Sequence, residues 1–136
     1  MAQEIKEIVL DWDGDLRFRG GLPGGHTTLV DGDSAEAMGP MALLLTALAG
    51  CTGADMAHIL ERMRAPLARC RIVARGTRRE AEPRRYVAIH LEFEVSGEGI
   101  DEARARRAAA LSLEKYCSVA HSLAPDIALT HDVRVI

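Results

Sequence analysis

The feature that most restricts what this chain can fold into is an apolar stretch from Met41 to Ala54, which has no charged residue and contains one cysteine, Cys51. The stretch is shorter than the ~20 residues that a membrane-spanning helix needs, and Asp55 ends it. The chain therefore has to enclose these residues in protein, and no membrane segment is expected.

Prolines mark both ends of this region. Gly39-Pro40 precedes it, and proline fits the first turn of a helix. Pro66 follows it, and a helix usually ends before such a residue. Residues 39–64 are therefore predicted to form a helix that is buried on nearly all faces, because apolar residues occupy nearly every face from Leu43 onward.

Strand patterns flank this helix on both sides. Asp13-Gly14 predicts a hairpin turn, and glycine-rich residues 20–25 are expected to form an irregular, mobile connection. Later in the chain, apolar residues alternate strictly with others and predict a strand with one buried face. These residues are Val87, Ile89, Leu91, Phe93 and Val95.

A second helix is predicted within residues 98–117, with Asp101 as its cap. Ala110, Leu113 and Cys117 would share one stripe of this helix. The expected strands lie within residues 7–21, 26–33, 70–80, 84–97 and 127–136. Runs of strands separated by two helices predict a single α+β domain over residues 1–136 with a mostly antiparallel sheet.

Composition excludes several classes of function. The net charge of −3 gives no general attraction to nucleic acid or to an anionic membrane. The N-terminal residues are acidic where a signal peptide would be basic, so a cytoplasmic protein is expected. Three cysteines without a CxxC pair predict neither a disulfide framework nor a zinc ribbon.

The surroundings of Cys51 leave its role open. Asp55 and His58 follow at positions i+4 and i+7 on the same helical face, which gives at most three metal ligands and no evident fourth. Cys51 and His58 would lie about 10 Å apart along the axis, beyond hydrogen-bond reach. No metal and no cofactor are therefore predicted. Cys117 is either a packing residue or a partner for Cys51 if the helices cross, and Cys70 is expected to be structural.

Two motifs give the chain a family resemblance. "LLLTALAGCTGADMAHILERMR" and, some sixty residues later, "LSLEKYCSVAHSL" resemble the OsmC/Ohr family, in its broad OsmC-like branch. The resemblance covers nearly the whole chain. It implies an OsmC-like fold in which mostly antiparallel sheets wrap around two central helices, and an intertwined homodimer with active sites at the subunit interface.

The resemblance also implies a chemistry. Characterised members are thiol peroxidases that reduce organic hydroperoxides, with Cys51 as the peroxidatic thiolate and Cys117 as the resolving thiol. The resulting disulfide is reduced by an external dithiol. An arginine near the N-terminus stabilises the thiolate in such enzymes. Arg19 is the first candidate here and Arg17 the second, since both face the same side of one predicted strand.

One family feature is absent from this sequence. A glutamate about ten residues before the first cysteine orients the arginine in the active enzymes, but Met41 and Ala42 occupy the corresponding positions here. Glu36 or a residue of the other subunit is the candidate replacement. The alternative function is therefore a non-peroxidatic protein of the same fold that binds a small apolar or electrophilic ligand at the dimer interface, or a thiol redox sensor.

Overall fold

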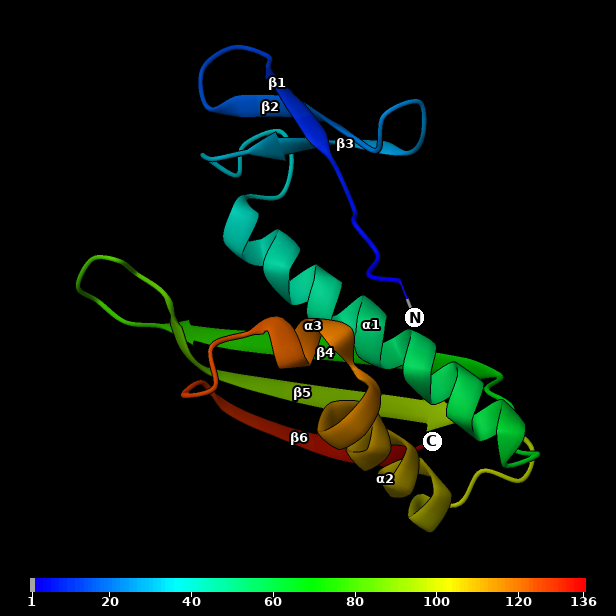
Figure 1. Ribbon diagram of the computed structural model, residues 1–136. Helices are drawn as coiled ribbons and strands as arrows, with labels where there is room; N and C mark the ends of the chain where they lie inside the picture. The colour runs from blue at the N-terminus through cyan, green and yellow to red at the C-terminus, as the bar shows by residue number, and fades with distance from the viewer. Residues whose placement is uncertain (1) are drawn as a thin grey trace. The chain divides into compact units, whose positions relative to one another are not determined.

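The chain forms two compact units, which divide between Leu44 and Leu45 in a computed structural model that describes residues 2–136 (Figure 1). Each unit contains one three-stranded sheet. The two sheets and two main helices confirm the predicted α+β class.

The first unit contains an antiparallel meander in the order β1-β2-β3. Its strands are β1 (Val9–Trp12), β2 (Arg17–Gly21) and β3 (Thr27–Asp31). Asp13-Gly14 lies in the predicted hairpin connection, where Gly14 has a φ of 91°. A positive φ of this kind is what makes glycine the preferred residue in such a turn.

The glycine-rich segment is more ordered than its composition predicted. Gly20 and Gly21 belong to β2 and pair with neighbours on both sides. A side chain at Gly20 would collide with the carbonyl oxygen of Val9, and one at Gly21 with that of His26. The expectation of an irregular connection from residue 20 is therefore wrong, because these two glycines let three strand backbones approach closely.

Helix α1 (Pro40–Arg62) begins at the predicted proline. It ends before Pro66 because Arg64 adopts a left-handed backbone, with a φ of 62°. Within the chain only one stripe of the helix is buried, at Leu48, Thr52, Met56 and Leu60. The prediction of burial on nearly all faces is therefore wrong for the single chain. By length and composition alone this helix could cross a membrane. This is weak evidence for a membrane span, because the core helices of soluble proteins share these properties.

The second unit is built on β4 (Arg69–Arg78), β5 (Tyr86–Ser96) and β6 (Ala128–Val135), in the order β4-β5-β6. β4 and β5 are antiparallel, whereas β5 and β6 are parallel and are joined by a helical crossover (Figure 1). Figure 1 shows the helical segments of this unit on one face of the sheet. Gly53 of α1 allows this packing, since an added Cβ would lie 2.8 Å from Cδ1 of Ile72 in β4.

The alternation predicted for β5 holds from Ile89 to Val95 but not at its start. Ile89, Leu91, Phe93 and Val95 are all at most 1% exposed, whereas Val87 is 37% exposed. The register shifts opposite Thr77 and Arg78, so Val87 is left out of the pairing as a bulge. A bulge turns the residue away from the face that its sequence position predicts.

The second helical region is divided. It consists of α2 (Glu102–Leu111), the π-helical turn η1 (Ser112–Tyr116) and α3 (Ser118–Ser122). Asp101 caps α2 as predicted by accepting a hydrogen bond from the Arg104 backbone N–H at 2.8 Å. Cys117 does not continue a stripe of α2, contrary to the prediction, because η1 adds a wider turn before it and Cys117 becomes the N-cap of α3.

Candidate functional site

The second unit brings two cysteines and an acid together. One donor atom each from Cys51, Asp55 and Cys117 lies within 4.8 Å of the other two. Cys117 is fully buried, and Cys51 and Asp55 are half-buried. The cluster joins α1 to the crossover between β5 and β6, so residues 66 positions apart in sequence share one site.

Local geometry explains how each side chain reaches the cluster. Cys51 and Asp55 are four residues apart in α1 and therefore lie on one face of the helix. Cys117 follows the π-helical turn, in which its backbone N–H donates to the Ser112 carbonyl at 2.6 Å. Such turns are frequent at functional sites, and this one is followed directly by Cys117 as the N-cap of α3.

Ser112 is the site residue that the sequence did not identify. Its side chain is fully buried, and its hydroxyl donates a 2.8 Å hydrogen bond to Oδ2 of Asp55. The bond fixes the carboxylate next to the two sulfur atoms. The only sequence signal was a polar residue after the alanine-rich run 108–110.

The environment of Cys117 keeps its thiol protonated. Burial raises the pKa of Cys117 to about 11, and the adjacent Cys51 side chain acts in the same direction. The Ala120 backbone N–H, which donates to Cys117 Sγ at 3.3 Å, lowers the pKa and partly opposes this effect. At neutral pH Cys117 is therefore a thiol and not a thiolate.

His58 is outside this cluster of donor atoms, although it shares a helical face with Asp55. It lines a neighbouring pocket of about 660 Å³ whose wall also includes Asp55, Arg62, Arg107 and Tyr116. A second hollow, of about 700 Å³, lies along charged residues such as Arg75 and Glu92 and includes neither Cys51 nor Cys117. Cys70 lies in β4, is exposed and belongs to neither pocket.

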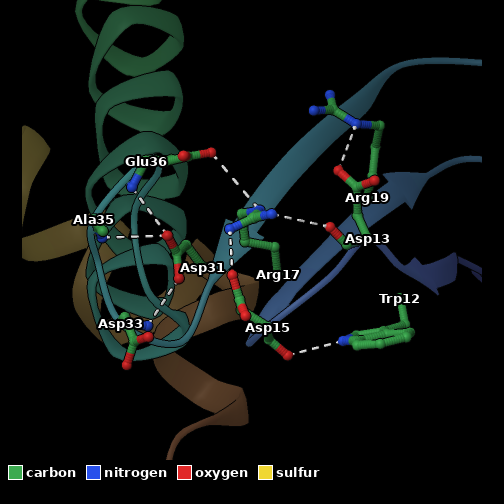
Figure 2. Close-up of polar contacts among 9 residues, drawn as sticks. All are labelled: Trp12, Asp13, Asp15, Arg17, Arg19, Asp31, Asp33, Ala35 and Glu36. Atoms are coloured by element: carbon green, nitrogen blue, oxygen red, sulfur yellow. Dashed lines mark hydrogen bonds and ion pairs between the residues drawn. The ribbon is translucent and has the colours of Figure 1, made fainter.

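The two candidate arginines lie in β2 of the first unit and have different partners (Figure 2). Arg17 has a 26% exposed side chain and pairs with Asp15 at 3.2 Å and with Glu36 at 3.7 Å. Arg19 has a 60% exposed side chain and pairs with Asp13 at 3.6 Å. Only Arg17 is therefore paired with the glutamate that the sequence offered as a replacement.

A buried carboxylate holds Glu36 in place. Asp31 is 2% exposed and accepts hydrogen bonds from the backbone N–H groups of Asp33 at 2.9 Å, Ala35 at 3.2 Å and Glu36 at 2.9 Å. Figure 2 shows this arrangement beside the Arg17–Glu36 pair. These bonds lower the pKa of Asp31, the Glu36 N–H most of all. Asp31 thus stays charged and fixes the loop that presents Glu36 to Arg17.

The fold and the site together define a class of α+β protein with two unpaired thiols side by side on neighbouring helical segments. Comparisons with known proteins agree with this description. A model of the OsmC family, described as OsmC-like protein, matches residues 31–132. The chain belongs to the OsmC-like protein family.

Relatives match over nearly the whole chain. The chain is 38% identical to Protein YhfA of Escherichia coli (strain K12) over 126 residues, which covers 92% of this chain and 94% of the relative. A hypothetical protein from Aquifex aeolicus VF5 has a similar structure, with a TM-score of 0.86, 29% identity and coverage of 98% of this chain and 99% of that one. The organic hydroperoxide resistance protein OsmC from Legionella pneumophila has a TM-score of 0.67 at 12% identity, over 98% of this chain and 100% of that one. At that identity the likeness concerns the fold alone.

Proposed function

We propose that this protein is a thiol peroxidase that reduces organic hydroperoxides through Cys51 and Cys117. The observation that carries the proposal is the proximity of the two sulfur atoms, within 4.8 Å in the reduced chain. The thiolate of Cys51 attacks the O–O bond, which leaves a sulfenic acid and, after proton uptake, releases an alcohol. Cys117 then gives up its proton and attacks the sulfenic sulfur as a thiolate, so that a disulfide forms and the sulfenic oxygen leaves with that proton as water.

The different environments of the thiols support these roles. Cys51 is half-buried, so a peroxide can reach it, whereas Cys117 is fully buried. A protonated Cys117 does not compete as the first nucleophile, because the thiolate is the reactive form. The cycle closes when an external dithiol reduces the disulfide and is itself oxidised.

Arg17 is the better supported partner of the thiolate, although Arg19 was the first candidate from the sequence. Peroxidases of the resembled family pair their arginine with a glutamate, and Arg17 pairs with Glu36. Glu36 would thus supply the carboxylate that is absent at Met41 and Ala42. Arg19 remains the alternative, and the variants Arg17→Ala and Arg19→Ala separate the two.

The exposed apolar side chains of the first unit support the homodimer that the resemblance implies. Val9, Leu10, Trp12 and Phe18 are between 39% and 68% exposed in the single chain. Leu10, Trp12 and Phe18 share one face of the β1–β2 pair. A contiguous exposed apolar patch of this kind marks an interaction surface, and a second copy of the chain is the proposed occupant. A cytoplasmic location, where thiols are kept reduced, fits the three free cysteines.

A second candidate function is supported by Asp55. Its negative charge beside Cys51 opposes a thiolate there. The neighbouring pocket combines apolar side chains of Ile59, Met63 and Leu111 with the cations Arg62 and Arg107. A non-peroxidatic protein would use this pocket to bind a small apolar or electrophilic ligand and would keep Cys51 as a redox sensor.

A thiol titration distinguishes the two functions. Reduced protein is mixed with cumene hydroperoxide in the presence of a metal chelator, and free thiols are counted over minutes. A peroxidase loses two thiols per chain, and Cys51→Ser abolishes the loss. Cys117→Ser leaves an oxidised Cys51 that forms no intrachain disulfide. Cys70→Ser is the matched control and behaves as the wild type.

The arginine assignment has its own measurement. Arg17→Ala should move the alkylation of Cys51 by iodoacetamide to higher pH, because a thiolate that loses a cation becomes less stable. Arg19→Ala should leave the profile unchanged. The reverse pattern would return the role to Arg19, and no shift in either variant would remove both arginines from the site. If all three thiols are retained throughout the peroxide titration, the peroxidase proposal fails.

A further inference from the structure

Three potential metal-ligand atoms lie close together around Cys51. A tetrahedral Zn²⁺ with Zn–S bonds of ~2.3 Å and Zn–O bonds of ~2.0 Å holds its ligand atoms roughly 3.3–3.8 Å apart. The donor atoms of Cys51, Asp55 and Cys117 are all within 4.8 Å of one another without any ion. Side-chain movements of about 1 Å would therefore bring all three donor atoms to bonding distance from a single ion.

The spacing of Cys51, Asp55 and His58 did not suggest this set. His58 does not take part, and its place is taken by Cys117, which follows η1. The donors thus come from two separate helical segments. Such a set surrounds an ion better than three residues of one helical face, which all approach it from the same side.

Polar contacts behind the donors hold two of them in position. Ser112 donates its hydroxyl proton to Oδ2 of Asp55 at 2.8 Å, which orients the carboxylate. The Ala120 N–H donates to Cys117 Sγ at 3.3 Å, which stabilises negative charge on this sulfur. Hydrogen bonds of this kind orient ligands and are an expected part of a metal site.

We propose that Cys51, Asp55 and Cys117 form a site for a divalent cation of the Zn²⁺ class, with a fourth position left to water. Two sulfur ligands and one carboxylate favour a borderline-soft ion over Mg²⁺ or Ca²⁺, which prefer oxygen ligands alone. Binding replaces the thiol protons of the two cysteines, so one Zn²⁺ enters and up to two protons leave. The bound ion also offsets the repulsion between the Asp55 carboxylate and a neighbouring thiolate.

The proposal does not depend on peroxidase activity. A metal on both sulfur atoms would block attack on a peroxide, and a disulfide between Cys51 and Cys117 would remove two of three ligands. Metal binding and thiol oxidation would therefore exclude one another at this site. A metal-loaded chain would be a stored, unreactive form of the dithiol.

Cobalt titration of the reduced, metal-free full-length protein is the direct test. Co²⁺ bound by thiolates gives a charge-transfer absorption in the near ultraviolet, which should saturate at one ion per chain and be displaced by Zn²⁺. Cys51→Ser and Cys117→Ser should each reduce this absorption and weaken binding. Asp55→Asn should weaken binding but keep the thiolate absorption. Cys70→Ser is the control that should bind as the wild type.

Ser112→Ala provides a test that leaves all three ligands in place. Loss of the hydrogen bond from Ser112 to the proposed ligand Asp55 should weaken metal binding about 10- to 100-fold. Circular dichroism shows whether each variant is folded, and isothermal calorimetry gives the affinity where the absorption is weak. The proposal is overturned if no saturable binding occurs, or if folded Cys117→Ser and Asp55→Asn bind Co²⁺ as tightly as the wild type. Because peroxide consumption is measured separately in chelator, failure here leaves the proposed function intact, and the reverse also holds.

Discussion

The two sheets have the same number of strands but opposite relations to solvent. In β5 the side chains of Ile89, Leu91, Phe93 and Val95 form a buried face with at most 1% exposure. In the β1–β3 sheet every residue of β1 is exposed. The residue of this sheet that is most buried is an acid, Asp31. One sheet is held by a hydrophobic core, and the other by strand pairing and a network of backbone hydrogen bonds around an acid.

The first sheet therefore has no hydrophobic core of its own among the described residues of the single chain. A three-stranded sheet needs an apolar face packed on something to be independently stable. The exposed apolar residues of the first unit are therefore the part of the molecule that most needs a covering surface, which the proposed homodimer would provide.

The largest expected effect on the free energy of unfolding comes from replacing a phenylalanine of the second sheet, compared with one of the first. Phe93→Ala should lower the free energy of unfolding by about 3–5 kcal/mol, because Phe93 is 1% exposed. The effect should be the same at all protein concentrations. Phe18→Ala should have a smaller effect that depends on protein concentration, because Phe18 is 39% exposed and lies on the proposed dimer surface.

Urea unfolding at two protein concentrations and analytical ultracentrifugation measure this comparison. Equal destabilisation by both variants in the dilute protein would mean that the first sheet has a core of its own.

An effect of intermediate size is expected on the stability of the first unit at acidic pH, where Asp31 becomes protonated. Because the pKa of Asp31 is lowered in the folded chain, its contribution to stability is complete above its ordinary pKa and is lost as the pH falls through the folded value. The first unit should therefore become less stable below about pH 4. Asp31→Asn should be less stable than the wild type at pH 7 and should lose little more on acidification.

The single tryptophan, Trp12, reports this change by fluorescence because it lies in β1. Asp126→Asn is a suitable control, since Asp126 is a 74% exposed residue of the second unit that pairs with Arg85. The same acid response in the Asp31→Asn variant as in the wild type would show that another group controls the unfolding of this sheet.

The smallest effect should come from the β5 bulge. Val87→Thr should change the free energy of unfolding by no more than about 0.5 kcal/mol, because Val87 is exposed. Ile89→Thr, two positions away, buries a hydroxyl in the core and should be clearly destabilising. Chemical denaturation of both variants gives the comparison, and similar losses would place Val87 in the core despite its position in the bulge.

Local patterns in the sequence predicted which segments form strands and helices. The bulge in β5 and the end of β2 depend instead on how the strands pair with one another. The alternation from Ile89 to Val95 follows from the two-residue period of a strand, so it was predictable. The bulge at Val87 depends on its pairing with Thr77 and Arg78 in β4, which is not a local property. Gly20 and Gly21 were likewise predicted to be loop residues, because their pairing with β1 and β3 is not a local property of the sequence.

The site was predictable where helical spacing or the resemblance applied. Asp55 was placed on the Cys51 face by spacing alone, and Cys117 was named by resemblance. Ser112 was missed because the π-helical turn that positions it arises from packing and has no clear sequence signal. The spacing of Arg17 and Arg19 could not separate them, since their different ion pairs depend on the loop that holds Glu36.

The π-helical turn makes the length of the crossover as important as its composition. A π-turn is equivalent to one extra residue in an α-helix, and each residue of an α-helix turns the chain by about 100°. Removing one of residues 113–116 would shorten the π-helical turn and is expected to change the position of Cys117 relative to Cys51, although Cys51, Asp55, Ser112 and Cys117 would all remain. Insertions and deletions in this short segment are therefore expected to separate the Cys51 and Cys117 sulfur atoms even where both cysteines are retained.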